Sequence, residues 1–325
     1  MRGPDLNRRG ATGLSMTTLL STLLLSTVLL STLLWSAPSS ACAACACGST
    51  AALPVGAELP FAGRIRLALS TQAFSTTTAD PLGDVTLFGG AAAVTVMVAV
   101  NRAIVVDGSL PLSLRLRRTD GTFDGRSAGL SDLGLGVRFV WTDRAFGPHL
   151  AASVRLGLTL PSSTTVTGRD GQPLTTPLQP GAGVLAPQLQ LTGVWLPSTT
   201  LSVMASLSGT APVLGLREDL GAAVVEGRLL TIVRATDTVS LRGGLLARGV
   251  SDTIHVTDDP AIHDDHAASA HNGSDARAAV GPEVGVTVDL GIDTALAATA
   301  SLPVLAFGGA VTDGGRAELT LLVDW

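Results

Sequence analysis

The sequence has no lysine and no tyrosine, and it is poor in aromatic and charged residues. Only 14% of its 325 residues are charged and 3% are aromatic, whereas soluble domains contain about 25% charged residues. The 21 basic residues, all arginine, and 26 acidic residues give a net charge of −5, which argues against a nucleic-acid-binding protein. The apolar content of 46% argues against a disordered chain. The mean hydropathy of +0.43 instead indicates a membrane protein.

Long apolar runs are also scarce, and only the run at 16–35 is long enough to cross a bilayer. It follows an arginine-containing segment and precedes small residues at 39–41. This order is typical of a secretory signal peptide, which we predict for residues 1–41. An uncleaved anchor helix is the alternative. If the rest of the chain lies in a membrane, it must cross as a β-barrel.

Cysteine occurs only in a short stretch, at Cys42, Cys45 and Cys47. We predict that residues 42–60 form a cysteine-containing periplasmic tail. Three thiolates are one fewer than a structural zinc site uses, although they could hold a soft metal. The alternatives are one disulfide with a spare thiol, or lipid attachment at Cys42.

Beyond residue 60, about twelve segments alternate large apolar with small or polar residues. In 149–160, for example, Leu150, Val154 and Leu158 share one face, while Ser153 and Arg155 share the other. A period of two predicts strands whose two faces meet different surroundings. The predicted strands are 61–71, 88–100, 103–117, 131–142, 148–160, 183–196, 200–209, 218–233, 237–249, 277–290, 294–304 and 316–325.

The links between these segments alternate in length. Those after even-numbered strands are short, such as 101–102, and those after odd-numbered strands are longer, above all 161–182 and 250–276. This rhythm is typical of bacterial outer-membrane barrels, with short periplasmic turns and long external loops. We therefore predict an all-β fold, an antiparallel transmembrane β-barrel of about 12 strands at 61–325, in the bacterial outer membrane. A secreted surface β-sandwich that binds a partner is the alternative.

The last strand carries a possible assembly signal. Trp325 shares a face with Val323, Leu321 and Leu319, and Asp324 lies on the opposite face. A terminal aromatic residue on an amphipathic strand resembles the signal that the outer-membrane assembly machinery recognises. Aromatic residues near the strand ends are expected to form interfacial girdles. They are Phe139, Trp141, Phe146, Trp195 and Trp325 at the short-link ends, and Phe74, Phe88, Phe123 and Phe307 near the other rim.

Three fragments, in the same order and spacing, resemble the transporter-like outer-membrane barrels labelled as channels of the MetA-type phenol-degradation pathway. They are 131–139 (SDLGLGVRF), 157–163 (GLTLPSS) and 178–183 (LQPGAG), although Ser131 replaces the first glycine of the family pattern. The resemblance extends loosely over 61–325. It implies an outer-membrane channel or transporter for small molecules, with phenol not established as the substrate.

Charged residues of the barrel are expected to face the lumen, because a basic residue on the lipid face at the bilayer midplane costs about 2–4 kcal/mol. Such residues could make a weakly anion-preferring pore, or they could form a network of ion pairs that fills the interior. The expected lumen residues are Arg64, Arg66, Arg115, Arg117, Arg138, Arg155, Arg228, Arg242 and Arg248, with the acids Asp132, Glu226, Glu283, Asp289, Glu318 and Asp324.

The predicted loop 250–276 holds four of the five histidines, which are His255, His263, His266 and His271, among several aspartates. Imidazole and carboxylate groups so close together could bind a divalent metal. A solvated acidic loop that binds metals loosely is the alternative.

Local signatures of catalysis are weak in the sequence. No Walker-type phosphate loop occurs, and the one G-x-S-x-G match, GRSAG at 125–129, does not by itself indicate catalysis, because that motif acts only at a strand-to-helix turn. His149 and Ser153 share a strand face, but four residues of strand separate them by about 13 Å. We therefore predict a passive channel or transporter for small solutes, with no enzyme activity, no required cofactor and the lipid bilayer as its environment. A metal-related barrel that uses the histidine loop and the cysteine tail is the runner-up.

Overall fold

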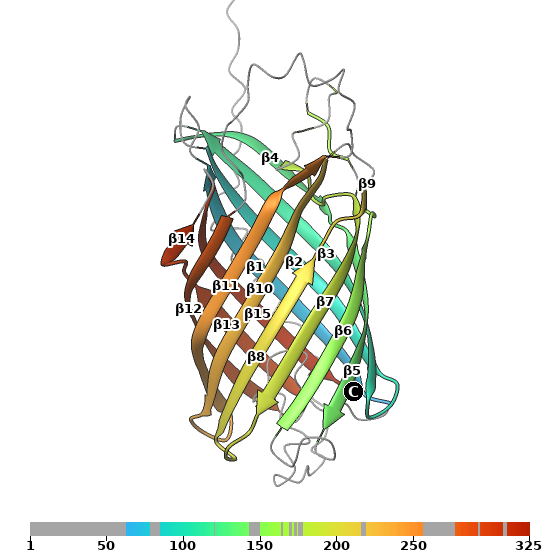
Figure 1. The fold of residues 1–325 in the computed structure, drawn as a ribbon, viewed down its shortest axis with the longest axis vertical. Helices are drawn as coiled ribbons and strands as arrows, with labels where there is room; N and C mark the ends of the chain where they lie inside the picture. Colours follow the sequence, from blue (N-terminus) through green and yellow to red (C-terminus); the bar gives the residue numbers. More distant parts are fainter. Residues whose placement is uncertain are drawn as a thin grey trace, which may run out of the picture. The chain divides into compact units, whose positions relative to one another are not determined.

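The strands of the computed structural model form one antiparallel sheet that closes on itself (Figure 1). The described residues all belong to the unit Cys42–Trp325. Among them, no helix is long and apolar enough to cross a membrane. The described ranges are 63–78, 85–119, 121–142, 150–163, 165–168, 171, 174, 178–215, 219–255, 277–291, 293–307 and 311–325.

Twelve strands make up the barrel wall, because three of the fifteen labelled strands continue or extend another. β4 and β5 both pair with β3, β13 and β14 both pair with β12, and β9 extends the wall beyond β8 beside β7. The strands are β1 (Ile65–Thr78), β2 (Val85–Ala99), β3 (Ile104–Thr119), β4 (Thr122–Leu130), β5 (Leu133–Thr142), β6 (Leu150–Leu160), β7 (Val184–Trp195), β8 (Leu201–Thr210), β9 (Leu214–Gly215), β10 (Asp219–Arg234), β11 (Val239–His255), β12 (Arg277–Gly291), β13 (Thr294–Ser301), β14 (Leu305–Phe307) and β15 (Val311–Asp324).

The barrel closes where the first strand pairs with the last. β1 is antiparallel to β15, from the pair Arg66–Asp324 to the pair Thr78–Val311. The backbone N–H of Trp325 donates to the carbonyl of Ile65 at 2.8 Å, and the reverse bond is 3.0 Å long. The prediction of a twelve-stranded antiparallel barrel is therefore confirmed, and the β-sandwich alternative is wrong, because a sandwich leaves its edge strands unpaired.

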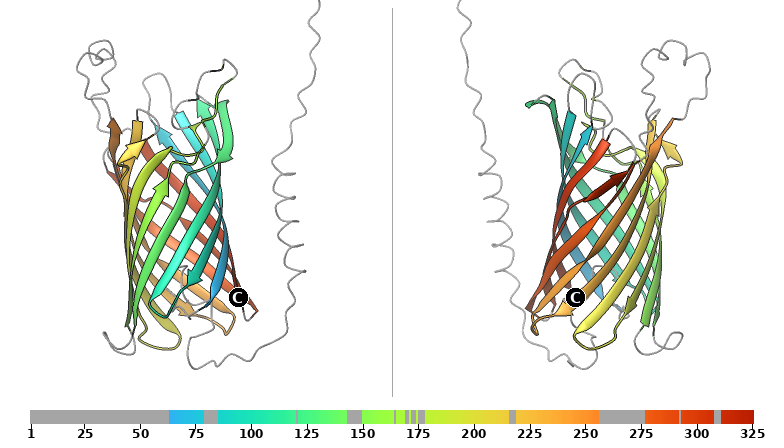
Figure 2. Two further views of the ribbon diagram at one scale, coloured as in Figure 1. Left: turned by 90° about the vertical axis from the view of Figure 1, so that its right-hand side faces the viewer. Right: turned by 60° about the vertical axis from the view of Figure 1, so that its left-hand side comes forward.

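The two ends of the barrel differ in their connections. Short turns join β2 to β3, β7 to β8, β10 to β11 and β12 to β13, all at one end, where the C-terminus also lies (Figure 2). The longer connections lie at the other end, which we call the long-loop end. The structure describes part of the connection between β6 and β7, whereas 256–276, between β11 and β12, lies outside the described residues.

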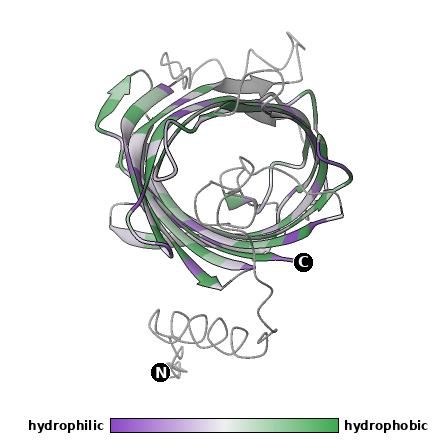
Figure 3. Cartoon of the chain, turned by 90° about the horizontal axis from the view of Figure 1, so that it is seen from below, coloured by the Kyte–Doolittle hydropathy of each residue, from purple (hydrophilic) through white to green (hydrophobic). Residues whose placement is uncertain are grey.

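The two faces of the wall follow the alternation of the sequence (Figure 3). Leu110, Leu112 and Leu114 of β3 are exposed on the outer face, whereas Asp107 and Ser113 of the same strand are buried on the inner face. Near the short turns, apolar side chains also line the inside, in the buried clusters Val194, Met204, Leu230 and Ala68, Met97, Ala295, Leu322. An apolar outer face suits contact with lipid, while the inner face keeps most of the polar groups.

The aromatic residues only partly follow the girdle prediction. Phe139, Trp141, Trp195 and Trp325 near the short turns are exposed, as are Phe88, Phe123 and Phe307 near the other rim. Phe146 lies outside the described residues. Phe74 was assigned wrongly, because β1 continues to Thr78 and the alternation carries Phe74 to the inner face. Its ring lies over Gly89 of β2, where any side chain would collide with it.

Candidate functional site

The inner face near the short turns is held by ion pairs between the first and last strands. Arg66 donates from Nε to Oδ1 of Asp324 at 2.5 Å and from Nη2 to Oδ2 at 2.8 Å. Arg64 donates to the same carboxylate. The Asp324 side chain is only 2% exposed, so these guanidinium groups replace its hydration. This cluster fixes the seam at which the barrel closes.

A second ion pair crosses three strands in the middle of the barrel. Arg155 of β6 donates to both carboxylate oxygens of Asp107 of β3, with Nε–Oδ1 at 2.8 Å, and its Nη1 donates to Gln188 Oε1 at 3.0 Å. Gly136 lies on β5, the strand between β3 and β6, and it pairs with Asp107 of β3 on one side and with Gly157 of β6 on the other. A Cβ atom at Gly136 would lie 2.5 Å from the guanidinium. The missing side chain therefore leaves the space through which Arg155 reaches Asp107.

A third network joins β10, β12 and β15. Arg228 Nη2 donates to Glu226 Oε1 at 2.6 Å, and Arg228 Nη1 lies 3.7 Å from Glu283 Oε1. Arg316 Nη1 donates to Glu226 Oε2 at 3.2 Å. Positive and negative side chains are thus neighbours on this part of the inner wall. Here the lumen carries paired charges, as the alternative of an ion-pair network predicts, and not a surface of one sign.

The three sequence fragments that resemble the channel family meet at one place on the inner wall. Asp132 accepts hydrogen bonds from the backbone N–H of Ser163 at 3.1 Å and of Gly183 at 2.8 Å. Ser113 and Ser131 both donate to the carbonyl of Pro180, at 2.5 and 2.9 Å. The segment Leu178–Gly183 is therefore fastened to the inner face of β3, β4 and β5, and we call it the wall segment.

Burial supports this packing of the wall segment. Leu178, Gln179 and Pro180 are all buried. Leu178 fits over Gly125 of β4, where an added Cβ would lie 2.6 Å from its Cδ1 atom. The Leu178 carbonyl also accepts a hydrogen bond from Ser127. The wall segment thus occupies part of the barrel interior near the long-loop end.

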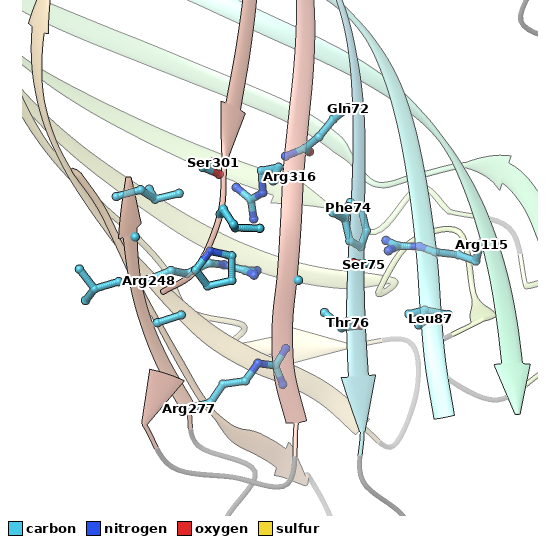
Figure 4. Close-up of a pocket in the computed structure, with 17 residues that line it drawn as sticks. Gln72, Phe74, Ser75, Thr76, Leu87, Arg115, Arg248, Arg277, Ser301 and Arg316 are labelled. Carbon is cyan, nitrogen blue, oxygen red and sulfur yellow. The ribbon is translucent and has the colours of Figure 1, made fainter. Parts of the chain in front are cut away.

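A cavity of about 360 Å³ lies inside the barrel at the long-loop end (Figure 4). Its polar groups are the guanidinium groups of four arginines together with Gln72, Ser75, Thr76 and Ser301. Phe74 and several aliphatic side chains form its apolar lining. The arginines, from four different strands, are Arg115, Arg248, Arg277 and Arg316.

The wall beside this cavity is split. The ladder between β13 and β15 stops at the pair Ser301–Arg316, and β14 pairs with β12 through Ala278–Phe307 to Val280–Leu305. Among the described residues, no backbone pairing joins β14 to β15. In Figure 1 β14 lies at the margin of the barrel.

A second, mostly apolar cavity of about 510 Å³ lies at the same split. Its lining includes Ala73, Phe88 and Val284 of the outer face, and it shares Phe74, Ser75, Ser301, Leu302 and Arg316 with the inner cavity. Phe88 and Val284 are exposed. The inner cavity therefore adjoins the lipid-facing surface as well as the lumen.

None of the fifteen charged residues that are expected to face the lumen is exposed. Five of them are buried, namely Arg66, Asp132, Arg138, Glu283 and Asp324, and the others are half-buried, namely Arg64, Arg115, Arg117, Arg155, Glu226, Arg228, Arg242, Arg248, Asp289 and Glu318. Asp132 has a structural partner, since it holds the wall segment. The role of the remaining residues in selectivity stays a prediction.

Sequence reasoning missed Asp107, Gln188, Arg277 and Arg316. The alternation contains the signal for the three charged residues, because Asp107 has the parity of Arg115, Arg277 that of Glu283, and Arg316 that of Glu318. The cavity itself has no such signal, since Arg115 on β3 lies near the arginines of β11, β12 and β15 only when the barrel closes.

The predicted metal-binding residues lie beyond what the structure describes. Cys42, Cys45, Cys47, His263, His266 and His271 fall outside the described residues, and His255 is described only as the last residue of β11. Among the described side chains, no group of three or more potential ligands could hold a metal ion. The metal prediction is therefore untested.

The residues of the predicted assembly signal differ in exposure. Trp325 and Leu319 are exposed, Leu321 is half-buried and Val323 is 9% exposed. Their recognition by the assembly machinery stays a prediction.

The fold is similar to that of known outer-membrane proteins. No protein-family model matches the sequence, and no curated protein matches it. The COG4313 outer membrane channel from Pseudomonas putida F1 matches 84% of this chain and 99% of its own, with a TM-score of 0.63 and 15% identity. The translocator domain of the autotransporter NalP from Neisseria meningitidis matches 83% of this chain and 90% of its own, with a TM-score of 0.46 and 13% identity. The chain therefore has the fold of a transporter-like outer-membrane β-barrel, as the resemblance of its three sequence fragments implies.

Proposed function

We propose that the protein is a passive channel for small solutes in the bacterial outer membrane, without catalytic activity. The observation that carries this proposal is the cavity of about 360 Å³ inside a closed barrel, at the long-loop end and beside the split between β14 and β15. A solute that enters the barrel at its long-loop end can occupy this cavity. The name of the Pseudomonas putida structure, an outer membrane channel, supports the same function.

The width and the lining of the lumen suit small polar and amphiphilic solutes better than large ones. Ion pairs such as Arg155–Asp107 lie on the inner wall, and the wall segment occupies part of the interior. In a twelve-stranded barrel such groups leave a narrower path than the aqueous channel of the larger porins. The proposed selectivity therefore follows from the remaining width and from the charges along it.

The segments before the barrel complete the proposal. Residues 1–41 act as a cleaved export signal, and residues 42–60 form a periplasmic tail. The assembly machinery of the outer membrane then recognises β15 together with the exposed Trp325 that follows it.

Two measurements test the proposed channel. Purified protein in detergent should migrate faster on an SDS gel before boiling than after, as a closed barrel does. In liposomes it should release small solutes while retaining large ones, without an energy source. A protein that shows the gel shift but passes neither ions nor small solutes would contradict the channel function.

A further inference from the structure

Four arginines line the cavity at the long-loop end, and no carboxylate is among its described lining residues. Figure 4 shows Arg115 extending from one side of the cavity, while Arg248 and Arg277 extend from the opposite side. Arg316, on β15, already pairs with Glu226 outside the cavity. The result is a concentration of positive charge around a hollow that is also partly apolar.

Arg115 differs from the paired arginines of the lumen. Its guanidinium carbon lies 4.9 Å from the centre of the Phe74 ring. Its Nε atom is buried without a hydrogen-bond partner, and no described carboxylate pairs with it. The ring offers a cation–π contact, but it does not satisfy the buried Nε–H group, which needs a hydrogen-bond acceptor, and an anionic acceptor makes the strongest such bond.

The other arginines of the lumen indicate which anion fits. Arg66 and Arg155 each hold a carboxylate through two of their nitrogens. A guanidinium fork matches the two oxygens of a carboxylate. Arg115 presents a guanidinium to a cavity whose described lining contains no carboxylate, so a carboxylate partner can come from a solute.

The apolar lining and the size of the cavity define the rest of the ligand. Phe74, Leu87, Leu246 and Leu302 contribute to the lining. A cavity of about 150 Å³ in another protein holds a benzene molecule, so about 360 Å³ has room for one aromatic ring and its carboxylate. Aromatic rings prefer offset or edge-to-face contacts with a phenylalanine such as Phe74.

We propose that this cavity is a binding site for small monoaromatic carboxylates. The carboxylate accepts hydrogen bonds from Arg115, and the ring packs against Phe74 and the neighbouring leucines. This site rests on the proposed channel function and names its solute class. Arg115 and Phe74 are the residues that determine the specificity.

Calorimetric titration of the detergent-solubilised barrel tests the site, with benzoate and its neutral analogue benzyl alcohol as probes. Benzoate should bind to one saturable site, at least about tenfold more tightly than benzyl alcohol. Arg115→Gln should weaken benzoate about tenfold or more and leave benzyl alcohol unchanged. Arg118→Gln is the matched control, because Arg118 lies on the same strand, is exposed and does not line the cavity.

A second variant and a third probe, acetate, test the contribution of the aromatic ring. Phe74→Leu should weaken benzoate more than acetate, because only benzoate has a ring, and the gel shift verifies that each variant is folded. Equal affinity for benzoate and benzyl alcohol, or full affinity in Arg115→Gln, would overturn the site. Liposomes that pass both probes without saturable binding would overturn the site and leave the channel function standing. Benzoate binding without any solute passage would overturn the channel function alone.

Discussion

Arg66 and Asp324 are 258 positions apart in the sequence, yet they are direct neighbours across the seam between β1 and β15. Their side chains are 7% and 2% exposed. Because a two-nitrogen contact fits only one register, the pair specifies how the last strand meets the first. A slip of the last strand by one residue would also turn Asp324 to the lipid face.

Asp324→Asn should therefore destabilise the closed barrel. The change leaves the buried Arg66 and the half-buried Arg64 without their carboxylate, and removing one partner of a buried pair costs about 3–5 kcal/mol. The urea concentration at which the gel shift disappears should fall accordingly. Asp237→Asn, in the exposed turn between β10 and β11, is the control and should have no effect. A wild-type midpoint in Asp324→Asn would mean that backbone pairing alone fixes the seam.

The segment between β13 and β14, beside the split, packs closely against a glycine of β12. A Cβ atom at Gly281 would collide with the carbonyl oxygen of Leu302 and lie 2.9 Å from Cα of Pro303, both of which are backbone atoms. Gly281→Ala must therefore push the segment between β13 and β14 away from β12, at a cost of about 1–3 kcal/mol. The unfolding midpoint in urea should fall. Gly243→Ala on β11, where an added Cβ meets no atom within 4 Å, should be neutral.

The alternation of the sequence predicts the twelve strands and the face of most residues because a strand between lipid and lumen has two unlike environments. Phe74 is an exception. The predicted strand ends at residue 71, whereas β1 extends to Thr78 and its parity turns Phe74 inward. Gly89, which makes room for the ring, comes from the next strand. Which residue of β2 lies beside the Phe74 ring depends on the register of the two strands, and an alternating sequence pattern does not determine that register.

The ion pairs show a similar limit. That Arg155 faces the lumen follows from its strand, but its partner depends on the glycine between β3 and β6. Gly136 lets the guanidinium pass over β5 to Asp107. The position of the cavity is still harder to predict from the sequence, because its four arginines all come together only in the closed barrel.

The wall segment should limit the width of the lumen. Asp132→Ala removes the acceptor for the backbone N–H groups of Ser163 and Gly183, and it should release the segment from the wall. Single-channel recordings should then show larger and more variable conductance than the wild-type protein. Asp293→Ala, an exposed residue in the turn between β12 and β13, should leave the conductance unchanged. Unchanged conductance in Asp132→Ala would mean that the segment does not narrow the path.

The charge balance of the lumen should set its ion preference. Asp107→Asn removes a negative charge at 7% exposure and leaves Arg155 without its carboxylate, so the path gains positive charge. The reversal potential in a potassium chloride gradient should shift toward chloride, relative to both the wild-type protein and Asp237→Asn. The shift should be larger near 0.1 M than near 1 M salt, because the Debye length falls from about 10 Å to about 3 Å. A shift of the same size at both concentrations would contradict an electrostatic origin, and no shift at all would place the conducting path away from Asp107.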